Sequence, residues 1–372
     1  MPSPYILCAM SIDLHGTGGQ GGAGGGEAPR REGIVVLTER ELRQVVALDH
    51  DALAAIEEAF SRLAAGQAEV PPILGLFVPE RRGEVDVKGA VIQGLPSLAI
   101  KIASGFFDNQ SWGLPSGSGL MVVLSARTGY PQAILLDNGY LTDVRTALAG
   151  AAAARHLAPR ALRTVGIVGA GAQGRYQAQA LQLVRSFDRV LVYDRSQAAV
   201  EAYVREMPGV LGRHRAAGGA GGGAPVEVEA ADPETLVRRS DLVVTCTPSH
   251  EPIVRAEWLH AGLHVTAMGA DTPEKHELES AVLGRASRLA CDLKRQCFER
   301  GEFRHARADG AIGDATPIAE LGELTSGRQP GRRDDSEITV CALTGVGVQD
   351  TAIALLAYGR AAAAGLGAKF DG

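Results

Sequence analysis

Residues 164–174 read TVGIVGAGAQG, an apolar run that ends in a glycine-rich turn with the spacing G-x-G-x-x-G. With 47 glycines among 372 residues, roughly 0.7 matches to this spacing are expected by chance, and the glycine-rich N-terminal region contains two more. Only the match at 169–174 follows an apolar strand pattern and opens a helical pattern, over residues 172–184. This context predicts a strand–turn–helix unit that binds a dinucleotide.

The glycines of this turn have separate tasks in such a unit. The first permits the tight turn, the second lets the backbone approach a pyrophosphate, and the third lets the helix pack against the strand. The helix N-terminus supplies N–H donors to the phosphates. The candidate cofactor-binding residues of the turn are Gly169, Gly171, Ala172, Gln173 and Gly174.

An acidic residue follows the next apolar run. Asp194 lies 194 − 171 = 23 residues after Gly171, close to the spacing of the acid that binds a ribose diol in this kind of unit. A carboxylate repels a 2′-phosphate, so Asp194 favours NAD(H). Arg195 is suited to a 2′-phosphate, so NADP(H) stays open as an alternative cofactor.

Apolar runs and helical segments alternate after residue 164, which is typical of parallel βαβ units. Before that point, runs within 85–137 are separated by short turns, which indicates an antiparallel or mixed sheet. We also expect a capping box at Thr38 and Glu41, and a helix that starts after Asp49. A helix over 142–157 and a strand and helix after residue 337 complete the pattern. The expected parallel strands are 164–170, 188–194, 240–247, 262–269 and 287–292.

Composition narrows the class of protein. The net charge of −6 offers no basic excess for nucleic acid, and no apolar run approaches the roughly 20 residues of a membrane span. The five cysteines show no CxxC spacing, which argues against a disulfide framework and a metal site. The short apolar patch near the N-terminus lacks a preceding basic residue and makes a poor signal peptide. We therefore expect a cytoplasmic protein without nucleic-acid or membrane partners.

Two glycine-rich stretches, at 15–33 and 214–225, contain too little apolar surface to fold. We expect the first to be a flexible arm and the second a disordered loop.

Three charged residues outside the turn are candidates for catalysis. Asp271 follows the apolar run 262–269, and the carboxyl end of such a strand is where nicotinamide and substrate meet. Lys101 within a strand and Arg145 in the opening turns of a helix are suited to a substrate carboxylate. Each residue also has an ordinary structural interpretation, as an edge charge, a solvated helix residue or a turn residue. No nucleophile or metal-binding motif competes with them in the sequence.

Several long strings resemble the ornithine cyclodeaminase/μ-crystallin family, over about Ile34 to Ala364. These are LLDNGYLTDVRTALAGAAAARHLAP (135–159), VGIVGAGAQGRYQAQAL (165–181), GADTPEKHELE (269–279) and ITVCALTGVGVQDTAIA (338–354). A narrower resemblance, to the ectoine-utilisation cyclodeaminase (EutC) branch, rests on GEVDVK (83–88), KIASGFFDN (101–109), GLPSGSGLMVVLSARTG (113–129) and LTGVGVQDTAIA (343–354).

The resemblance implies an α/β homodimer in which a Rossmann domain is inserted into an α+β substrate-binding and dimerisation domain. The implied boundaries are a glycine-rich arm at 1–33, a substrate domain at 34–147 and 336–372, and a Rossmann domain at 148–335. It also implies NAD(P) and a small amino or imino acid as ligands. In this picture Lys101 and Arg145 contact the substrate carboxylate, Asp271 is the acid/base, and Lys275 supports the cofactor or the loop. Thr247 and Lys275 complete the candidate cofactor-binding set.

Two departures from the ornithine-converting pattern bear on the substrate. Pro71 and Pro72 are followed by Ile73 where the family often has Arg, and Lys88 stands where ornithine-converting members have an acid. A cation at Lys88 disfavours the distal ammonium of ornithine and suits a second carboxylate or a smaller imino acid. We therefore favour imine reduction in ectoine or hydroxyectoine breakdown. Ammonia-releasing cyclodeamination is the first alternative, and a non-catalytic μ-crystallin-like binding protein is the second.

Overall fold

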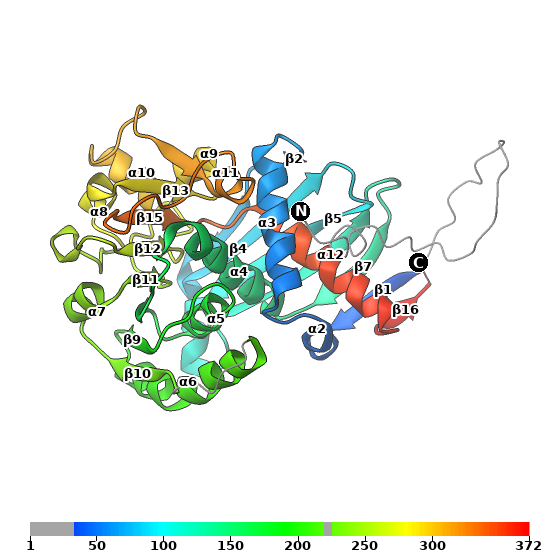
Figure 1. The fold of residues 1–372 in the computed structure, drawn as a ribbon. Helices are drawn as coiled ribbons and strands as arrows, with labels where there is room; N and C mark the ends of the chain where they lie inside the picture. Colours follow the sequence, from blue (N-terminus) through cyan, green and yellow to red (C-terminus); the bar gives the residue numbers. More distant parts are fainter. Residues whose placement is uncertain (1–32, 219–224, 372) are drawn as a thin grey trace. The chain divides into compact units, whose positions relative to one another are not determined.

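The computed structural model describes residues 33–218 and 225–371. These residues form two compact units, and the chain passes from the first to the second at residues 48 and 143 and returns at residues 66 and 347 (Figure 1). Unit 1 comprises the described residues of Met1–Ala47, Gly66–Thr142 and Gly347–Gly372, and unit 2 comprises those of Leu48–Ala65 and Asp143–Val346.

Unit 1 contains an eight-stranded sheet in the order β16-β1-β7-β6-β5-β4-β2, with β3 also paired to β4. All of its strand pairs are antiparallel except β1 with β7, which are parallel. The sheet is therefore mixed, as the short turns between the apolar runs indicated. Its strands are β1 (Ile34–Thr38), β2 (Ala68–Glu69), β3 (Leu74–Val78), β4 (Gly83–Ile92), β5 (Ser97–Phe106), β6 (Gly117–Ser125), β7 (Pro131–Leu136) and β16 (Ala368–Phe370).

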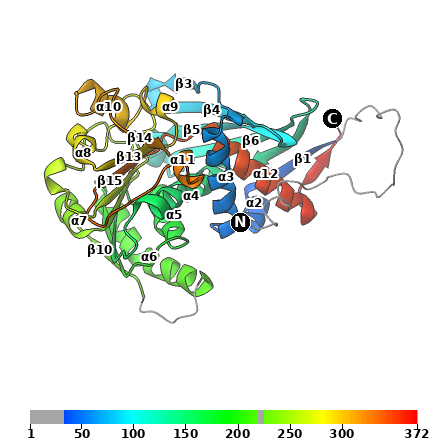
Figure 2. The same cartoon turned by 45° about the horizontal axis from the view of Figure 1, so that its top comes forward.

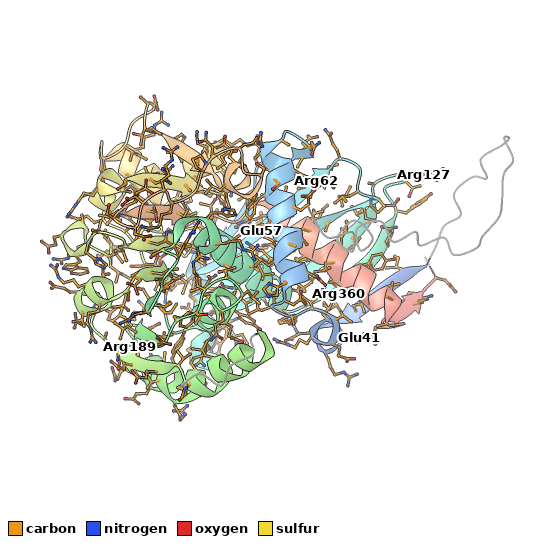
Figure 3. All side chains as sticks on the ribbon, viewed as in Figure 1. Glu41, Glu57, Arg62, Arg127, Arg189 and Arg360 are labelled. Atoms are coloured by element: carbon orange, nitrogen blue, oxygen red, sulfur yellow. The ribbon has the colours of Figure 1, made fainter. Side chains whose placement is uncertain are left out.

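Helix α12 (Gly347–Ala363) packs on β4 and β5 of this sheet (Figure 2). A Cβ on Gly347 would collide with the carbonyl oxygen of Gly89, so glycine lets the start of the helix approach β4 closely. Arg360 donates to the carbonyl of Val45 at 3.1 Å, which ties α12 to the end of α2 (Glu39–Val45) (Figure 3).

The two faces of the unit 1 sheet differ. On the face with α12, Ala99, Met121, Val123 and Leu135 are fully buried. On the other face the aliphatic side chains are only partly covered, and Ile102 is 37% exposed. Side chains alternate along a strand. The sheet therefore has one buried face and one apolar face that the chain covers only in part.

Unit 2 contains an eight-stranded parallel sheet in the order β10-β9-β8-β11-β12-β15-β13-β14. The chain moves outward from β8 to β9 and β10, and then continues on the other side of β8 with β11 and β12. This places a topological switch point between β8 and β11. The strands are β8 (Thr164–Val168), β9 (Arg189–Tyr193), β10 (Glu227–Ala230), β11 (Leu242–Thr245), β12 (His264–Ala267), β13 (Arg288–Cys291), β14 (Ile318–Glu320) and β15 (Thr339–Ala342).

The helices of unit 2 complete an α/β fold around a core of buried aliphatic residues, which includes Val168, Leu191, Val243, Val265 and Val340. The α-helices are α3 (His50–Ala64), α5 (Ala172–Leu181), α6 (Gln197–Gly218), α7 (Pro233–Arg239), α8 (Ser280–Arg285), α9 (Lys294–Cys297), α10 (Glu302–Ala308) and α11 (Leu321–Thr325), together with α4 (Tyr140–Leu157) from Asp143 onward.

Local sequence signals were confirmed in several places. The five expected parallel strands are present, Thr38 and Glu41 form the capping box, and Asp49 accepts from the Ala52 N–H at 2.8 Å at the start of α3. Helix α4 begins at Tyr140 rather than Thr142, because Asp137 accepts from the Leu141 N–H at 2.8 Å.

Two further differences concern chain segments. The strand after residue 337 was assigned with the substrate domain, whereas β15 pairs with β12 and β13 in the unit 2 sheet. Helix α6 continues to Gly218 into the stretch expected to be a loop, because the Arg and Ala residues there are good helix formers. The rest of that stretch up to residue 224, and the expected arm up to residue 32, lie outside the described residues.

Within residues 33–218 and 225–371, no helix combines the length and apolarity needed to cross a membrane.

Candidate active site

The glycine-rich turn joins β8 to α5 at the switch point. Gly169 has a φ of +113°, which L side chains rarely adopt, and a Cβ there would lie 3.0 Å from the carbonyl oxygen of Cys246. A Cβ on Gly174 would collide with the carbonyl oxygen of Gly169. At Gly171, the N-cap of α5, a Cβ would meet no described atom within 4 Å. Neighbouring atoms thus pack closely against Gly169 and Gly174, whereas no described atom lies within 4 Å of the Cβ position at Gly171. The first N–H groups of the helix, which lack intrahelical partners, start at this position.

Asp194 connects this turn to the end of β9. Its Oδ2 accepts from the Ala170 N–H at 2.9 Å, and its Oδ1 accepts from the Ser196 N–H at 2.8 Å. A carboxylate has about four acceptor sites, so these two bonds leave capacity for hydroxyl groups of a ribose. The neighbouring Arg195 is exposed.

Glu277 is a fully buried carboxylate that ties the ends of β11 and β12 together. Its Oε1 accepts from the N–H of Thr247 at 2.6 Å and from the Thr247 hydroxyl at 2.8 Å. Its Oε2 accepts from the Thr245 hydroxyl and the Gly269 N–H, both at 2.8 Å. Burial raises the pKa of Glu277 to about 7, although these four hydrogen bonds favour the ionised form. Thr247, a candidate cofactor contact, therefore directs both of its donors to Glu277.

A second buried carboxylate supports Glu277 from α10. Glu302 accepts from the N–H groups of Glu277 at 2.8 Å and Leu278 at 3.2 Å. Burial, and then the charge of Glu277, raise the pKa of Glu302 well above its ordinary value. The ring of His276 stacks on His305 with the centroids 4.2 Å apart. Side chains of α10 thus hold residues 276–278 in place.

Asp271 lies just past β12, at the carboxyl edge of the parallel sheet. Its Oδ1 is 2.8 Å from Nζ of Lys275, and Arg300 donates to its carbonyl oxygen at 3.2 Å. The Asp271 side chain is 35% exposed, whereas that of Lys275 is 7% exposed. The site therefore holds a carboxylate that solvent or a ligand can reach, beside a cation that is fixed by burial.

Arg145 lies on α4 and is 5% exposed. Its guanidinium faces the loop after β15, because a Cβ on Gly345 would lie 3.0 Å from Nη1. Asp292, at the end of β13, holds that loop by accepting from the N–H groups of Thr344 at 2.8 Å and Gly345 at 2.7 Å. The guanidinium is thus placed at the carboxyl ends of the strands of unit 2.

The two candidate lysines lie directly opposite each other on β4 and β5 of unit 1. Lys101 is 2% exposed and its Nζ is 3.0 Å from Oδ1 of Asp350 on α12. Lys88 is 6% exposed and its Nζ is 3.3 Å from Oδ2 of Asp86. Like charges directly opposite in a sheet repel each other, so each lysine depends on its own carboxylate.

Asp137, which follows β7, is a further buried acid of unit 1. It is 1% exposed, and burial raises its pKa, while the positive charge of Lys101 opposes that rise. Lys88 and Lys101 on this sheet thus lie near acids that come from β4, from α12 and from the end of β7.

Comparison with known proteins identifies the family. Residues 33–365 match the sequence profile of the ornithine cyclodeaminase/mu-crystallin family. The chain belongs to this family. An uncharacterised cyclodeaminase of Sinorhizobium fredii is 48% identical over 337 residues, which cover 90% of this chain and 98% of that protein.

Solved structures of reductases and dehydrogenases share the family fold. The Δ1-pyrroline-2-carboxylate reductase of Thermococcus litoralis, in complex with NADH and L-proline, has a TM-score of 0.82 at 27% identity and covers 91% of this chain and 100% of its own. An archaeal alanine dehydrogenase dimer with bound NAD has a TM-score of 0.80 at 32% identity, with 91% and 99% covered. The iminosuccinate reductase of Paracoccus denitrificans with NAD⁺ has a TM-score of 0.78 at 29% identity, again with 91% and 99% covered.

In this member of the ornithine cyclodeaminase/mu-crystallin family, the structure brings Asp271 and Lys275 together in unit 2, and Lys88 and Lys101 together in unit 1. The side chain of Gln173 is directed to Asp143 on α4, so only its backbone faces the turn. The roles of these residues stay predictions.

The acids that hold these groups were not singled out from the sequence. Asp350 lies inside the string 338–354, where a carboxylate within an otherwise apolar and small-residue run was the available signal. Glu277 lies among several other charged residues in the string 269–279, so nothing local marked it as buried. Within the part of the chain that the structure describes, no group of three acidic, histidine or cysteine side chains is arranged to hold a metal ion.

Proposed function

We propose that this chain catalyses hydride transfer between NAD(H) and the α-carbon of an amino or imino acid, in the direction of imine reduction. The observation that carries the proposal is Asp271, a partly exposed carboxylate at the carboxyl edge of a parallel sheet whose switch point carries the glycine-rich turn. NAD(H)-bound reductases and a dehydrogenase with the same fold support this reaction class.

The residues at the turn fit a dinucleotide. A Cβ at Gly171 would enter open space in front of the α5 N-terminus, which is where a pyrophosphate needs close approach to the backbone. Asp194 has acceptor capacity left for the ribose diol, and its charge disfavours a 2′-phosphate. When bound, the nicotinamide supplies or accepts the hydride.

Asp271 would move the proton on the substrate nitrogen. A general acid or base must be accessible and fixed, and Asp271 satisfies both conditions because Lys275 holds one of its oxygens. In imine reduction, Asp271 would donate a proton to the substrate nitrogen as hydride arrives at the α-carbon, and it would take that proton back in the reverse reaction. Glu277 and Glu302 hold the segment that follows and so fix this loop.

Lys101 and Arg145 would bind the substrate carboxylate, and Lys88 would bind a second carboxylate or leave room for a smaller imino acid. Lys88 and Lys101 are adjacent across β4 and β5 and present two buried ammonium groups on one face. A fold relative that reduces iminosuccinate supports a dicarboxylic substrate. We place this reduction in ectoine or hydroxyectoine breakdown, in line with the strings that resemble that branch.

Cyclodeamination of ornithine or a related diamino acid is the alternative, favoured by the cyclodeaminase relative of 48% identity. The test is to follow NADH absorbance with cyclic and acyclic imines, including iminosuccinate and Δ1-pyrroline-2-carboxylate, beside an assay of ammonia release from ornithine and diaminobutyrate. NADH oxidation with an imine supports the proposal. Ammonia release without NADH consumption supports cyclodeamination, and tight ligand binding without either reaction supports a μ-crystallin-like binding protein.

We further propose that the protein is a homodimer formed through the partly open face of the unit 1 sheet. Val91, Ile102 and Leu136 on that face are 44%, 37% and 40% exposed, and a contiguous apolar face of this kind is typical of an interface. The archaeal alanine dehydrogenase with this fold is a dimer. Light scattering should give a dimer for the wild type and a monomer for Ile102→Glu.

A further inference from the structure

In unit 2, side-chain amides join helices α4 and α5. Gln173, in the first turn of α5, donates from Nε2 to Oδ1 of Asp143 at 2.7 Å and to the Asp143 carbonyl at 3.3 Å. Gln177, one turn later, donates to the carbonyl of Thr146 at 3.2 Å. The donors are four residues apart on α5 and the acceptors three apart on α4, so each pair lies on one face of its helix.

The packing around Gln177 leaves little freedom. Gln177 is fully buried, and a Cβ on Gly150 of α4 would collide with its Oε1. Its Nε2 is also 2.7 Å from Sδ of Met268, which follows β12 three residues before Asp271. Removing a buried donor leaves its acceptors unsatisfied, so this arrangement has few alternatives of similar energy.

The position of Arg145 makes this connection relevant to the reaction. Arg145 lies between the two acceptor residues, Asp143 and Thr146, so α5 holds the α4 backbone on both sides of it. Gln173 is the second residue of α5, next to the N–H groups that would face the pyrophosphate. If a bound phosphate orders the N-terminal turn of α5, these hydrogen bonds would also order the turn of α4 that carries Arg145.

We propose that Gln173 and Gln177 are positioning residues that transmit nucleotide binding at the α5 N-terminus to the opening turns of α4, and so prepare Arg145 for the substrate carboxylate. This inference rests on the proposed function, because it takes α5 as the phosphate site and Arg145 as the carboxylate site. Since coupling between two ligands is reciprocal, a bound carboxylate would also tighten NADH binding.

The test uses NADH as the probe and amide hydrogen exchange of residues 144–150 as the readout. NADH should slow this exchange at least about threefold in the wild type, beyond its effect on α10 in the same unit. Gln177→Met keeps the volume of the side chain but removes the donor, and should lose this α4 protection while the Kd for NADH changes less than about threefold. Gln179→Leu is the matched control, because the Gln179 amide donates to Arg175 of its own helix, and it should keep the protection.

The readout is the difference between the exchange rates with and without NADH. A variant that merely loosens α4 exchanges faster both with and without NADH, so this difference separates a positioning role from a general loss of stability. If Gln177→Met does not fold, Gln173→Met is the second variant, because it removes both hydrogen bonds to Asp143 and the acceptor for the Gln177 amide while the bond from Gln177 to Thr146 is kept. Full α4 protection in the folded variant, or no α4 protection in a wild type that binds NADH by calorimetry, overturns the inference and leaves the proposed function intact. A wild type that does not bind NADH overturns both.

Discussion

At the carboxyl edge of the unit 2 sheet, the buried carboxylate of Glu277 is surrounded by backbone N–H groups and threonine hydroxyls. In unit 1, the buried carboxylate of Asp350 on α12 is paired with the ammonium group of Lys101 on β5. The first arrangement fixes two loops through neutral donors. The second pairs two opposite charges that are both buried. In unit 2 a buried acid thus fixes loops, whereas in unit 1 a buried acid partners a buried cation.

The largest expected effect separates Asp271 from these buried acids. Asp271→Asn keeps the shape and a hydrogen-bonding group but removes the acid/base, so kcat should fall about 100- to 10,000-fold. The Kd for NADH should barely change, because the turn and Asp194 are untouched. Arg145→Ala should mainly raise KM, because a charge-assisted contact to the carboxylate is lost in ground and transition states alike. Steady-state kinetics with calorimetry checks both, and full turnover in Asp271→Asn would eliminate its assigned role.

The charge pair of unit 1 is expected to be the most sensitive structural element. Lys101→Met leaves Asp350 buried without its cation, which should lower the free energy of unfolding by about 3–5 kcal/mol. Adding Asp350→Asn should recover part of that loss, because the uncompensated charge is removed. Urea unfolding of the single and double variants measures this coupling, and strictly additive losses would contradict the pairing.

The hydrogen-bonded acid of unit 2 should respond less to neutralisation. Glu277→Gln turns one acceptor into a donor that faces other donors, at a cost of about 1–3 kcal/mol. Because burial raises the pKa of Glu277 from 4.5 to about 7, its contribution to stability is full below pH 4.5 and is lost as the pH rises through about 7. The urea midpoint of the wild type should therefore fall as the pH rises from about 4.5 to about 7, and that of the Gln variant should not. Parallel pH profiles of the two proteins would argue against a shifted Glu277.

The smallest expected effect tests whether the turn of unit 2 has a shape that serves a ligand. Gly171→Ala should leave the Tm unchanged, because its Cβ meets no described atom within 4 Å, and should weaken NADH binding about tenfold, or 1.4 kcal/mol. Gly174→Ala should instead lower the Tm, because its Cβ would collide with the Gly169 carbonyl. Thermal melts and calorimetry on both variants check the distinction. An unchanged NADH affinity in Gly171→Ala would show that the pyrophosphate does not bind beside Gly171.

The sequence predicted the parts of this molecule whose signals are local. The strand before Gly169, the helix after it and the capping box at Thr38 depend on residues a few positions apart, and all are present. The position of β15 between β12 and β13 in the sheet was not predicted, because strand order depends on pairing between distant segments.

The same limit applies to the candidate site. Asp271 and Lys275 are four residues apart and were both identified, whereas Asp350 lies 350 − 101 = 249 residues from Lys101. Glu277 reaches Thr245 across 32 residues. The partners of a buried acid that are distant in the sequence cannot be identified before the fold is known. Glu277 and Asp350 were therefore found only in the structure.

The pairing of β1 with β16 has a consequence for biosynthesis. These are the first and last strands of the described chain, with Ile34 opposite Phe370, so this edge of the unit 1 sheet is completed only after residues 368–370 have been translated. At about 5–20 residues per second, β1 leaves the ribosome tens of seconds before its partner exists. Unit 2 has all of its strands by residue 342 and can fold on the nascent chain, while β1 waits with one unpaired edge. Chaperone dependence during translation should therefore concentrate on unit 1.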